Sequence, residues 1–422
     1  MRRLHFFGLL QQVELGEKII KKIIAITQVT VDGIMSAVGS LRFSISLKAL
    51  GALAFALTLN LAPATGAAST NSLFPGAVGK RLDSQISAIM RKNNLPSVVA
   101  HVTVPGRGRY TFVGGFANLR TRLSRTLNQP FRIASVTKPF AATAVLVLVD
   151  RGLLRTTDPM SKWYPHFPNA QRITVADLLR MRSGIPAPDD NAVLAKVYDS
   201  PLAPAPTLED ELASYARLRK QFRAPDTVGV YTDFNYDVLA GIVRRVTGKD
   251  IGVLITQTVI HPLKLRGTSY PTGTGIPGPL RGYGWNSKMK RFDDKTLFNP
   301  PLAGAAGAVI STARDLETFN RAVCRGSLLK PATHRAQLIG KPIIGTHATY
   351  GEGIIYDGKV CGHSGTINGF NTDMYYFSKQ DATLVVSVNR LDRDNKSQTG
   401  PILTLMIEAI GSLPSSGQQA LH

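Results

Sequence analysis

A serine and a lysine three positions apart, Ser135 and Lys138, open a long apolar stretch of this chain. On a helix, positions i and i+3 share a face, so the amine of Lys138 would point back at the hydroxyl of Ser135. A serine hydroxyl is a weak nucleophile that needs a base, and a lysine is such a base where its surroundings lower its pKa. The pair therefore predicts a serine nucleophile. The spacing also arises by chance, in which case Lys138 is a surface lysine on a first helical turn.

Two later segments carry further residues that could act beside such a pair. The first contains Tyr231 and Asp233, and the second contains His363, Gly365 and Thr366. Neither segment is informative alone, because a tyrosine is most often a core residue and a lone histidine before a strand is more often structural. The information lies in the order of the three segments along the chain.

Together the three segments resemble the motifs of the serine β-lactamase and penicillin-binding-protein superfamily, in its subgroup of class C β-lactamases, DD-peptidases and related esterases. That family carries S-x-x-K, then Y-x-N, then K/H-x-G, which here fall on residues 135–138, 231–233 and 363–365. Other segments agree in the same order over roughly residues 80–412. The resemblance implies a β-lactamase/transpeptidase-like α+β fold, in which an antiparallel sheet is flanked by helices beside a mostly helical subdomain.

The resemblance also implies a role for each catalytic residue. Ser135 is acylated by the substrate, and Lys138 takes the proton of its hydroxyl. Tyr231 relays protons to the leaving group and assists the hydrolytic water. The backbone N–H groups of Ser135 and Thr366 form an oxyanion hole. These four residues therefore make up the expected reacting centre.

Besides Thr366, three residues are expected to contact the substrate, and two of them depart from the common pattern. Gly365 would let a substrate lie close against its strand. His363 stands where other members place Lys, so its charge near neutral pH would be partial and carboxylate capture pH dependent. Asp233 replaces the usual Asn, and an ionised Asp can only accept hydrogen bonds. Asp233 either shifts specificity towards substrates with an amine or N–H, or towards esters, or simply ion-pairs with Lys138.

The elements that must position these residues follow from the spacing of apolar residues and turn residues. The sequence predicts a helix over 79–92, a hairpin over 98–113 and a second helix over 141–154 after Ser135. Two more strands over 372–377 and 383–388 and a last helix over 401–410 follow. The middle of the chain, roughly 145–300, mixes short helices with proline-rich loops. This order predicts an α+β layer with a helical insertion rather than a βαβ repeat.

The N-terminal 68 residues have the layout of an extension that carries a secretory signal peptide. Arg42 and Lys48 precede an uncharged, mostly apolar run from Ala49 to Ala62, and small residues follow it. Translation that begins at Met35 would place the signal at the chain start. An uncleaved anchor or two ordinary buried helices are the alternatives. The hydrolase domain is expected over 69–412, with no stable membrane span after signal cleavage, followed by a disordered polar tail over 413–422.

The composition limits the classes of partner. The chain has 422 residues, a net charge of +22 and 44% hydrophobic residues, which indicates a globular protein rather than a disordered or multispan one. Its basic residues form no long run, which disfavours a nucleic-acid partner, while anionic lipid, a cell-wall polymer or a basic surface without a partner stays open. Cys324 and Cys361 form no CxxC or Cys/His cluster, so we expect no metal and no organic cofactor. In an oxidising compartment the two cysteines could pair.

The sequence thus predicts an exported, periplasmic or secreted serine hydrolase that acts through an acyl-enzyme on amide, peptide or ester bonds. A DD-carboxypeptidase or penicillin-binding-like enzyme or an esterase fits the motifs, with a small molecule or a peptidoglycan-type peptide as substrate. A class C-like β-lactamase is one alternative. A catalytically silent cell-wall-binding protein of the same fold is another, because a fold alone does not imply activity. The oligomeric state is not predicted.

Overall fold

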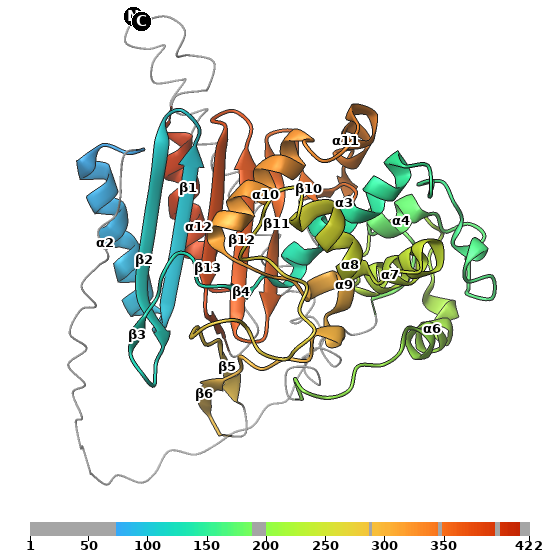
Figure 1. Ribbon diagram of the computed structural model, residues 1–422, viewed down its shortest axis with the longest axis horizontal. Helices are drawn as coiled ribbons and strands as arrows, with labels where there is room; N and C mark the ends of the chain where they lie inside the picture. The colour runs from blue at the N-terminus through green and yellow to red at the C-terminus, as the bar shows by residue number, and fades with distance from the viewer. Residues whose placement is uncertain (1–72, 188–199, 287–288, 345–347, 393–396, 414–422) are drawn as a thin grey trace, which may run out of the picture.

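A nine-stranded antiparallel sheet forms the middle layer of the protein (Figure 1). In spatial order its strands are β3 (Leu123–Ser124), β2 (Gly108–Asn118), β1 (Ser97–Val104), β13 (Ala382–Val388), β12 (Phe370–Phe377), β11 (Val360–Ile367), β10 (Ile355–Tyr356), β9 (Thr349–Tyr350) and β8 (Lys341–Pro342). The predicted hairpin is therefore β1–β2, and the two predicted C-terminal strands are β12 and β13. The computed structural model describes residues 73–187, 200–286, 289–344, 348–392 and 397–413. The expected signal peptide and the tail 414–422 lie outside these ranges.

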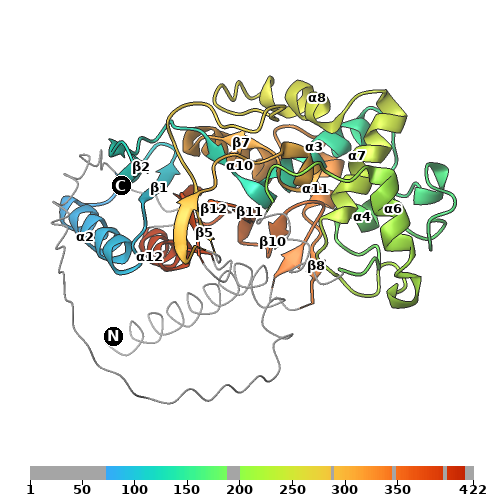
Figure 2. The ribbon, with the colours of Figure 1, turned by 90° about the horizontal axis from the view of Figure 1, so that it is seen from below.

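Helices cover both faces of the sheet and create two hydrophobic cores. On one face α2 (Gly76–Lys92) and α12 (Gly400–Gly411) pack together, as Figure 2 shows from below. On the other face lie α3 (Thr137–Asp150) and α10 (Ala313–Arg325). Side chains alternate along each strand, so every long strand contributes to both cores. The result is a three-layer α+β domain, as the sequence predicts.

The remaining helices gather at one end of the sheet, where Figure 1 shows α4, α6, α7 and α8 together. They are α4 (Val175–Leu179), α6 (Leu208–Ala216), α7 (Phe234–Thr247), α8 (Ile251–Ile255), α9 (Gly304–Gly307) and α11 (Pro331–Gln337). Single turns are η1 (Ala134–Val136), η2 (Met160–Lys162), η3 (Arg219–Gln221), η4 (Thr256–Ile260) and η5 (Pro300–Leu302). Two small sheets join β4 (Phe131–Arg132) to β7 (Ile310–Ser311), and β14 (Arg390–Leu391) to β5 (Tyr283–Asn286) and β6 (Arg291–Asp294). The stretch expected to be mostly helical thus also contains the β5–β6 hairpin.

Helix α3 is the central buried helix of the larger core. All residues from Thr137 to Leu148 are buried, which explains why this segment is apolar on every side. It begins at Thr137 and ends at Asp150, four residues earlier at each end than the sequence predicts. The proline at position 139 lies in the first turn, where a missing N–H costs no intrahelical hydrogen bond. A helix that begins this early carries Lys138 in its first turn.

A disulfide joins the central sheet to the helical layer that contains α3 and α10. Cys324 near the end of α10 and Cys361 in β11 are bonded, with an S–S distance of 2.06 Å. The pairing that the sequence left open is therefore present. It ties α10 to the strand that carries His363 and Gly365, and both cysteines belong to the larger core.

Asp373 is a charged group buried in the opposite core. Strand alternation places it on the same face of β12 as Tyr375 and Phe377, which pack in the core under α2 and α12. Its side chain is fully buried, and its polar neighbour Thr399 offsets the effect of burial on its pKa only in part. Burial raises the pKa of Asp373 from 3.8 to about 7. The folded protein therefore holds this carboxyl protonated at pH values where the unfolded chain has released the proton.

This difference predicts a stability that falls as pH rises from about 4 to about 7, because folding then requires proton uptake by Asp373. We expect Asp373→Asn to match the wild type at pH 4 and to exceed it at pH 8 by up to about 4 kcal/mol. Chemical denaturation of both proteins at the two pH values measures this difference. The exposed Asp250→Asn variant is the control and should show no such pH-dependent gain. An equal effect of Asp373→Asn at both pH values would contradict the buried, protonated carboxyl.

Candidate active site

Ser135 lies in a strained turn directly before α3 rather than on the helix itself. It is the middle residue of η1, and the preceding Ala134 has a positive φ of 51°. An L-residue in the left-handed region costs roughly 1–2 kcal/mol, so the surroundings must hold this turn in place. The N–H of Ile133 donates to the carbonyl of Val309, which anchors the turn to the neighbouring segment. The hydroxyl is thereby presented at the end of the buried helix.

Lys138 is fully buried directly below Ser135 and its amine has three acceptors. The Nζ donates to Ser135 Oγ at 3.0 Å and to the carbonyl of Ala306 in α9 at 3.0 Å. It also forms an ion pair with Asp233 Oδ1 at 2.7 Å. The contact between positions 135 and 138 that the sequence predicts is therefore present. Three acceptors satisfy the three N–H donors of an ammonium group.

The environment of Lys138 favours its charged form. Burial lowers the pKa of Lys138, but Asp233 and Tyr231 together outweigh that effect, and the pKa of Lys138 lies above its usual value. The ring of Tyr231 lies 4.8 Å from Nζ and the ring of Tyr236 lies 5.6 Å from it. These aromatic faces stabilise a cation as well. The resting site thus holds an ammonium beside the serine hydroxyl.

Tyr231 completes the group around Ser135. Burial raises its pKa, and interactions with Lys138 and Ser135 counter the rise in part. Its ring packs edge-on against Tyr350, with ring centroids 6.1 Å apart. A protonated hydroxyl in contact with both the serine and the lysine can pass a proton between them and a leaving group.

His363 is buried and neutral, which corrects the expectation of a partial positive charge. Its Nδ1–H donates to the carbonyl of Ser364, so Nε2 is the atom that accepts from the hydroxyl of Tyr350 at 3.1 Å. Burial, with the nearby charge of Lys138, lowers the pKa of His363 to about 3. At neutral pH the ring therefore supplies no charge for a substrate carboxylate. It orients Tyr350 instead.

Gly365 is needed for a close contact inside the protein, and its expected role in substrate approach stays a prediction. A Cβ at this position would collide with the carbonyl of Ile133 and would lie 3.0 Å from both Ala134 Cβ and Ser135 N. The absent side chain therefore lets β11 press against the turn that carries the nucleophile. This close approach brings the N–H of Ser135 next to β11.

Strand β11 presents an open edge beside the nucleophile. Strand β10 pairs only with Gly362 and Cys361, so within the described part of the chain the edge from His363 to Ile367 has no strand partner. On its other side β11 is fully paired with β12, and Asn371 donates to Thr366 Oγ1 at 3.3 Å. The backbone near Thr366 therefore has no strand partner on this edge among the described residues, and an extended substrate could pair with it there.

Several functional groups were missed by the sequence reasoning. Tertiary packing brings the carbonyl of Ala306 and the ring of Tyr350 to the site, and no local sequence pattern predicts them. Glu211 and Asp237 also lie near Asp233; burial raises the pKa of each carboxyl, and the charge of Asp233 adds to the rise. Asp237 follows Asp233 by four residues where α7 begins, a spacing that places both on one face of the helix.

The described residues contain no group of three or more His, Cys, Asp or Glu side chains placed to hold a metal ion. In the same part of the chain no helix is both long and apolar enough to cross a bilayer.

Comparisons with known proteins show the family to which this fold belongs. The chain is 27% identical over 329 residues to PbpX of Bacillus subtilis (strain 168), whose name places it among penicillin-binding proteins; the match covers 75% of this chain and 78% of that one. It is 24% identical to Protein flp of Staphylococcus aureus (strain COL), covering 74% of this chain and 63% of that protein.

Solved structures show the same fold. The D-stereospecific amidohydrolase from Streptomyces sp. is 28% identical with a TM-score of 0.66, covering 77% of this chain and 96% of that one. The D-amino acid amidase from Ochrobactrum anthropi SV3 is 23% identical with a TM-score of 0.67, covering 79% and 98%. The family model described as Beta-lactamase matches residues 82–405. The chain belongs to the β-lactamase family, within the wider superfamily of serine β-lactamases and penicillin-binding proteins.

Proposed function

We propose that this protein is an exported serine hydrolase that cleaves amide, peptide or ester bonds through an acyl-enzyme on Ser135. The observation that carries the proposal is the 3.0 Å contact between Ser135 Oγ and the fully buried Nζ of Lys138. A nucleophile and a base held within hydrogen-bond reach in a packed, water-poor setting is the arrangement that nucleophilic catalysis requires. Tyr231 beside both groups adds a proton relay.

The reaction would proceed in two balanced steps. In the first, Ser135 Oγ attacks the substrate carbonyl while neutral Lys138 accepts its proton, and the oxyanion is held by the N–H groups of Ser135 and Thr366. Tyr231 donates a proton to the leaving amine or alcohol as the scissile bond breaks, and Lys138 reprotonates Tyr231. In the second, water attacks the acyl-enzyme, and its proton returns to Ser135 Oγ as the acid is released.

The substrate range follows from the relatives and the site together. Relatives named for penicillin binding and for D-stereospecific amide hydrolysis support a DD-carboxypeptidase-like, amidase or esterase activity on a small molecule or peptidoglycan-type peptide. The presence of Ser135, Lys138 and Tyr231 in mutual contact favours an enzyme over a silent cell-wall-binding protein. A class C-like β-lactamase is a further outcome that the experiment below distinguishes.

Export is supported by two independent features. The segment from Arg42 to Ala68 has the charge, apolar run and small residues of a secretory signal. The Cys324–Cys361 disulfide is a bond that forms and persists in oxidising compartments. Both features support the proposal that the protein is exported.

Ser135→Ala should abolish covalent labelling and turnover. We expect the wild type to hydrolyse p-nitrophenyl acetate and to form an acyl adduct that intact-mass analysis detects. The variant should lose the adduct and lose activity by at least about 10³-fold, because the nucleophile is removed. Adding a fluorescent penicillin and a chromogenic cephalosporin separates a slow penicillin-binding enzyme from a β-lactamase. Equal activity of wild type and Ser135→Ala on every substrate would contradict the proposal.

Asp233→Asn should shift the pH dependence of kcat/KM. Only neutral Lys138 can accept a proton, and the Asp233 carboxylate raises the pKa of Lys138. Removing that charge lowers this pKa, so the acidic limb of the profile should move to lower pH by about 1–2 units. Glu209→Gln, an exposed change of equal charge on α6, should leave the profile in place. A profile that stays fixed in Asp233→Asn would show that Lys138 is not the titrating base.

The export proposal has its own test. Residues 1–72 fused to an alkaline phosphatase reporter, which needs disulfides for activity, should give an active enzyme in a bacterial host. Deletion of residues 49–62 from the same fusion removes the apolar run and should abolish that activity. If both fusions are equally active, or neither is, the segment is not an export signal.

A further inference from the structure

The short segment Asp226–Val230 leads directly into Tyr231, and it is held by side chains that the chemistry above does not use. At its start, Asp226 has a positive φ of 59°, in the left-handed region that L-residues rarely adopt. A residue in such a conformation persists only where its surroundings hold it there. The contacts of Asp226 therefore help to set the path by which the chain reaches Tyr231.

Three charge-assisted hydrogen bonds converge on the carboxylate of Asp226. Arg182 Nε donates to Oδ1 at 2.7 Å, while Lys341 Nζ donates to Oδ1 at 2.8 Å and to Oδ2 at 2.6 Å. Arg182 also donates through Nη2 to the backbone carbonyl of Asp226 at 2.7 Å and through Nη1 to the carbonyl of Pro342 at 3.1 Å. One guanidinium thus fixes both the side chain and the backbone of Asp226. We call Arg182, Asp226 and Lys341 the Asp226 ion-pair group.

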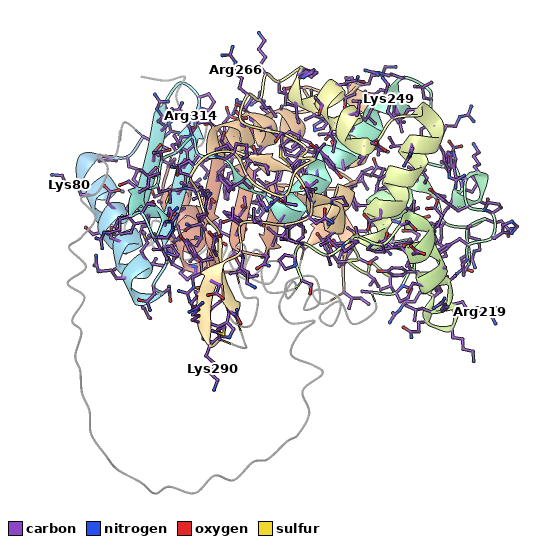
Figure 3. All side chains as sticks on the ribbon, turned by 60° about the horizontal axis from the view of Figure 1, so that its bottom comes forward. Lys80, Arg219, Lys249, Arg266, Lys290 and Arg314 are labelled. Atoms are coloured by element: carbon purple, nitrogen blue, oxygen red, sulfur yellow. A yellow bond between two sulfur atoms is a disulfide. The ribbon has the colours of Figure 1, made fainter. Side chains whose placement is uncertain are left out.

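The burial of Arg182 distinguishes this group from the other charges of the protein. The chain carries a net charge of +22, and the cations labelled in Figure 3, such as Lys80 and Lys290, project outward. Arg182 is only 8% exposed, and a buried cation is costly unless its donors are satisfied. The side chains of Asp226 and Lys341 are about half exposed, so water weakens their mutual attraction. Arg182 is therefore the member that restrains Asp226 most.

Backbone hydrogen bonds carry this restraint from Asp226 to Tyr231. The N–H of Asp226 donates to the carbonyl of Arg182 at 2.8 Å, and the N–H of Val230 donates to the carbonyl of Met181 at 2.8 Å. The segment that precedes Tyr231 is thus bound at both of its ends to two consecutive residues. A shift of Arg182 must move the residue next to Tyr231.

A second segment confines the same stretch from the other side. Gly229 lies so close to the end of β8 that an added Cβ would be 2.7 Å from the carbonyl oxygen of Pro342. The N–H of Ile344 donates to the carbonyl of Gly229 at 2.9 Å. Lys341, in the same segment, also belongs to the Asp226 ion-pair group. The chain before Tyr231 is therefore enclosed between two segments that Arg182 links to each other.

The place of the Tyr231 phenol matters because a proton donor acts only within hydrogen-bond reach of the leaving group. Its ring lies 4.8 Å from Lys138 Nζ and packs edge-on against Tyr350. In a site of this kind a displacement of about 1 Å can lower a rate by about 10²-fold. A departing amine needs a proton, whereas p-nitrophenolate leaves without one. A displaced Tyr231 should therefore slow amide cleavage far more than cleavage of an activated ester.

We propose that Arg182 and Asp226 are positioning residues for Tyr231, and that they determine how well the enzyme expels leaving groups that need a proton. Neither residue is placed to touch the reacting atoms; both act through the segment that ends at Tyr231. This inference rests on the proposed function and deepens it by naming the residues on which amide cleavage depends.

The first test compares two substrates with the same acyl group. Phenylalanine p-nitroanilide and phenylalanine p-nitrophenyl ester are measured in both enantiomers with the wild type and with Asp226→Asn. Asparagine has the same shape as aspartate and tolerates a positive φ, but it removes the charge. We expect kcat/KM to fall by at least about tenfold for the anilide and by less than about threefold for the ester. Equal losses on both substrates would show a merely structural role and overturn the proposal.

A second variant and a control assign the effect to the Asp226 ion-pair group. Arg182→Lys keeps the charge but lacks the planar fork that reaches several acceptors at once, so it should reproduce the selective loss on the anilide. Asp250→Asn removes another exposed aspartate that pairs with an arginine, at 3.8 Å from Arg244, and should change neither rate. An Arg182→Lys enzyme with the wild-type ratio of the two rates, or a control with the same selective loss, would overturn the assignment.

A spectroscopic measurement separates this inference from the proposed function. Full-length protein that carries 3-fluorotyrosine at position 231 reports the surroundings of that ring by fluorine NMR, whether or not a substrate is turned over. We expect the resonance to shift or broaden in Asp226→Asn and Arg182→Lys but not in Asp250→Asn. A changed resonance without any Ser135-dependent turnover would reject the hydrolase and keep the positioning of Tyr231. Turnover with an unchanged resonance and an unchanged ratio of the two rates would keep the hydrolase and overturn the positioning role.

Discussion

The buried ammonium of Lys138 is the interaction on which the arrangement of the site depends. A charge removed from water is costly unless each of its donors is satisfied. Here the hydroxyl of Ser135, the carbonyl of Ala306 and the carboxylate of Asp233 satisfy it, and these three groups come from three separate elements. Loss of any one partner leaves a buried donor unpaired. The lysine therefore fixes the relative positions of η1, α9 and the start of α7.

The charged state of Lys138 has opposite effects on folding and on the proposed chemistry. The ammonium stabilises the folded site, while proton abstraction from Ser135 needs the neutral amine. Asp233 moves the balance towards the folded, charged form, and the residue common in the family at this place, Asn, carries no charge. Asp233 therefore leaves less neutral Lys138 at a given pH, and it gives the buried ammonium a stronger internal anchor.

Much of the fold and of the candidate site could be predicted from the sequence, because the motifs depend on local geometry. The i, i+3 spacing of Ser135 and Lys138 survives even though the serine lies in a turn before the helix, since the turn continues directly into α3. The alternation of β12 and β13 and the apolar run of α3 report burial directly. The neutral state of His363 could not be predicted, because it depends on Tyr350 and on burial by distant segments. The internal role of Gly365 depends on the approach of Ile133, which no spacing reveals.

The close contact between Gly365 and the turn Ile133–Ser135 also limits how this protein can change during evolution. Any side chain at position 365 would push against that turn and displace the hydroxyl of Ser135, so position 365 is closed to variation. Helices α6 and α7, by contrast, carry several partly exposed positions. New substrate preferences in descendants of this chain should therefore arise through substitutions in those helices, while Gly365 is inherited unchanged.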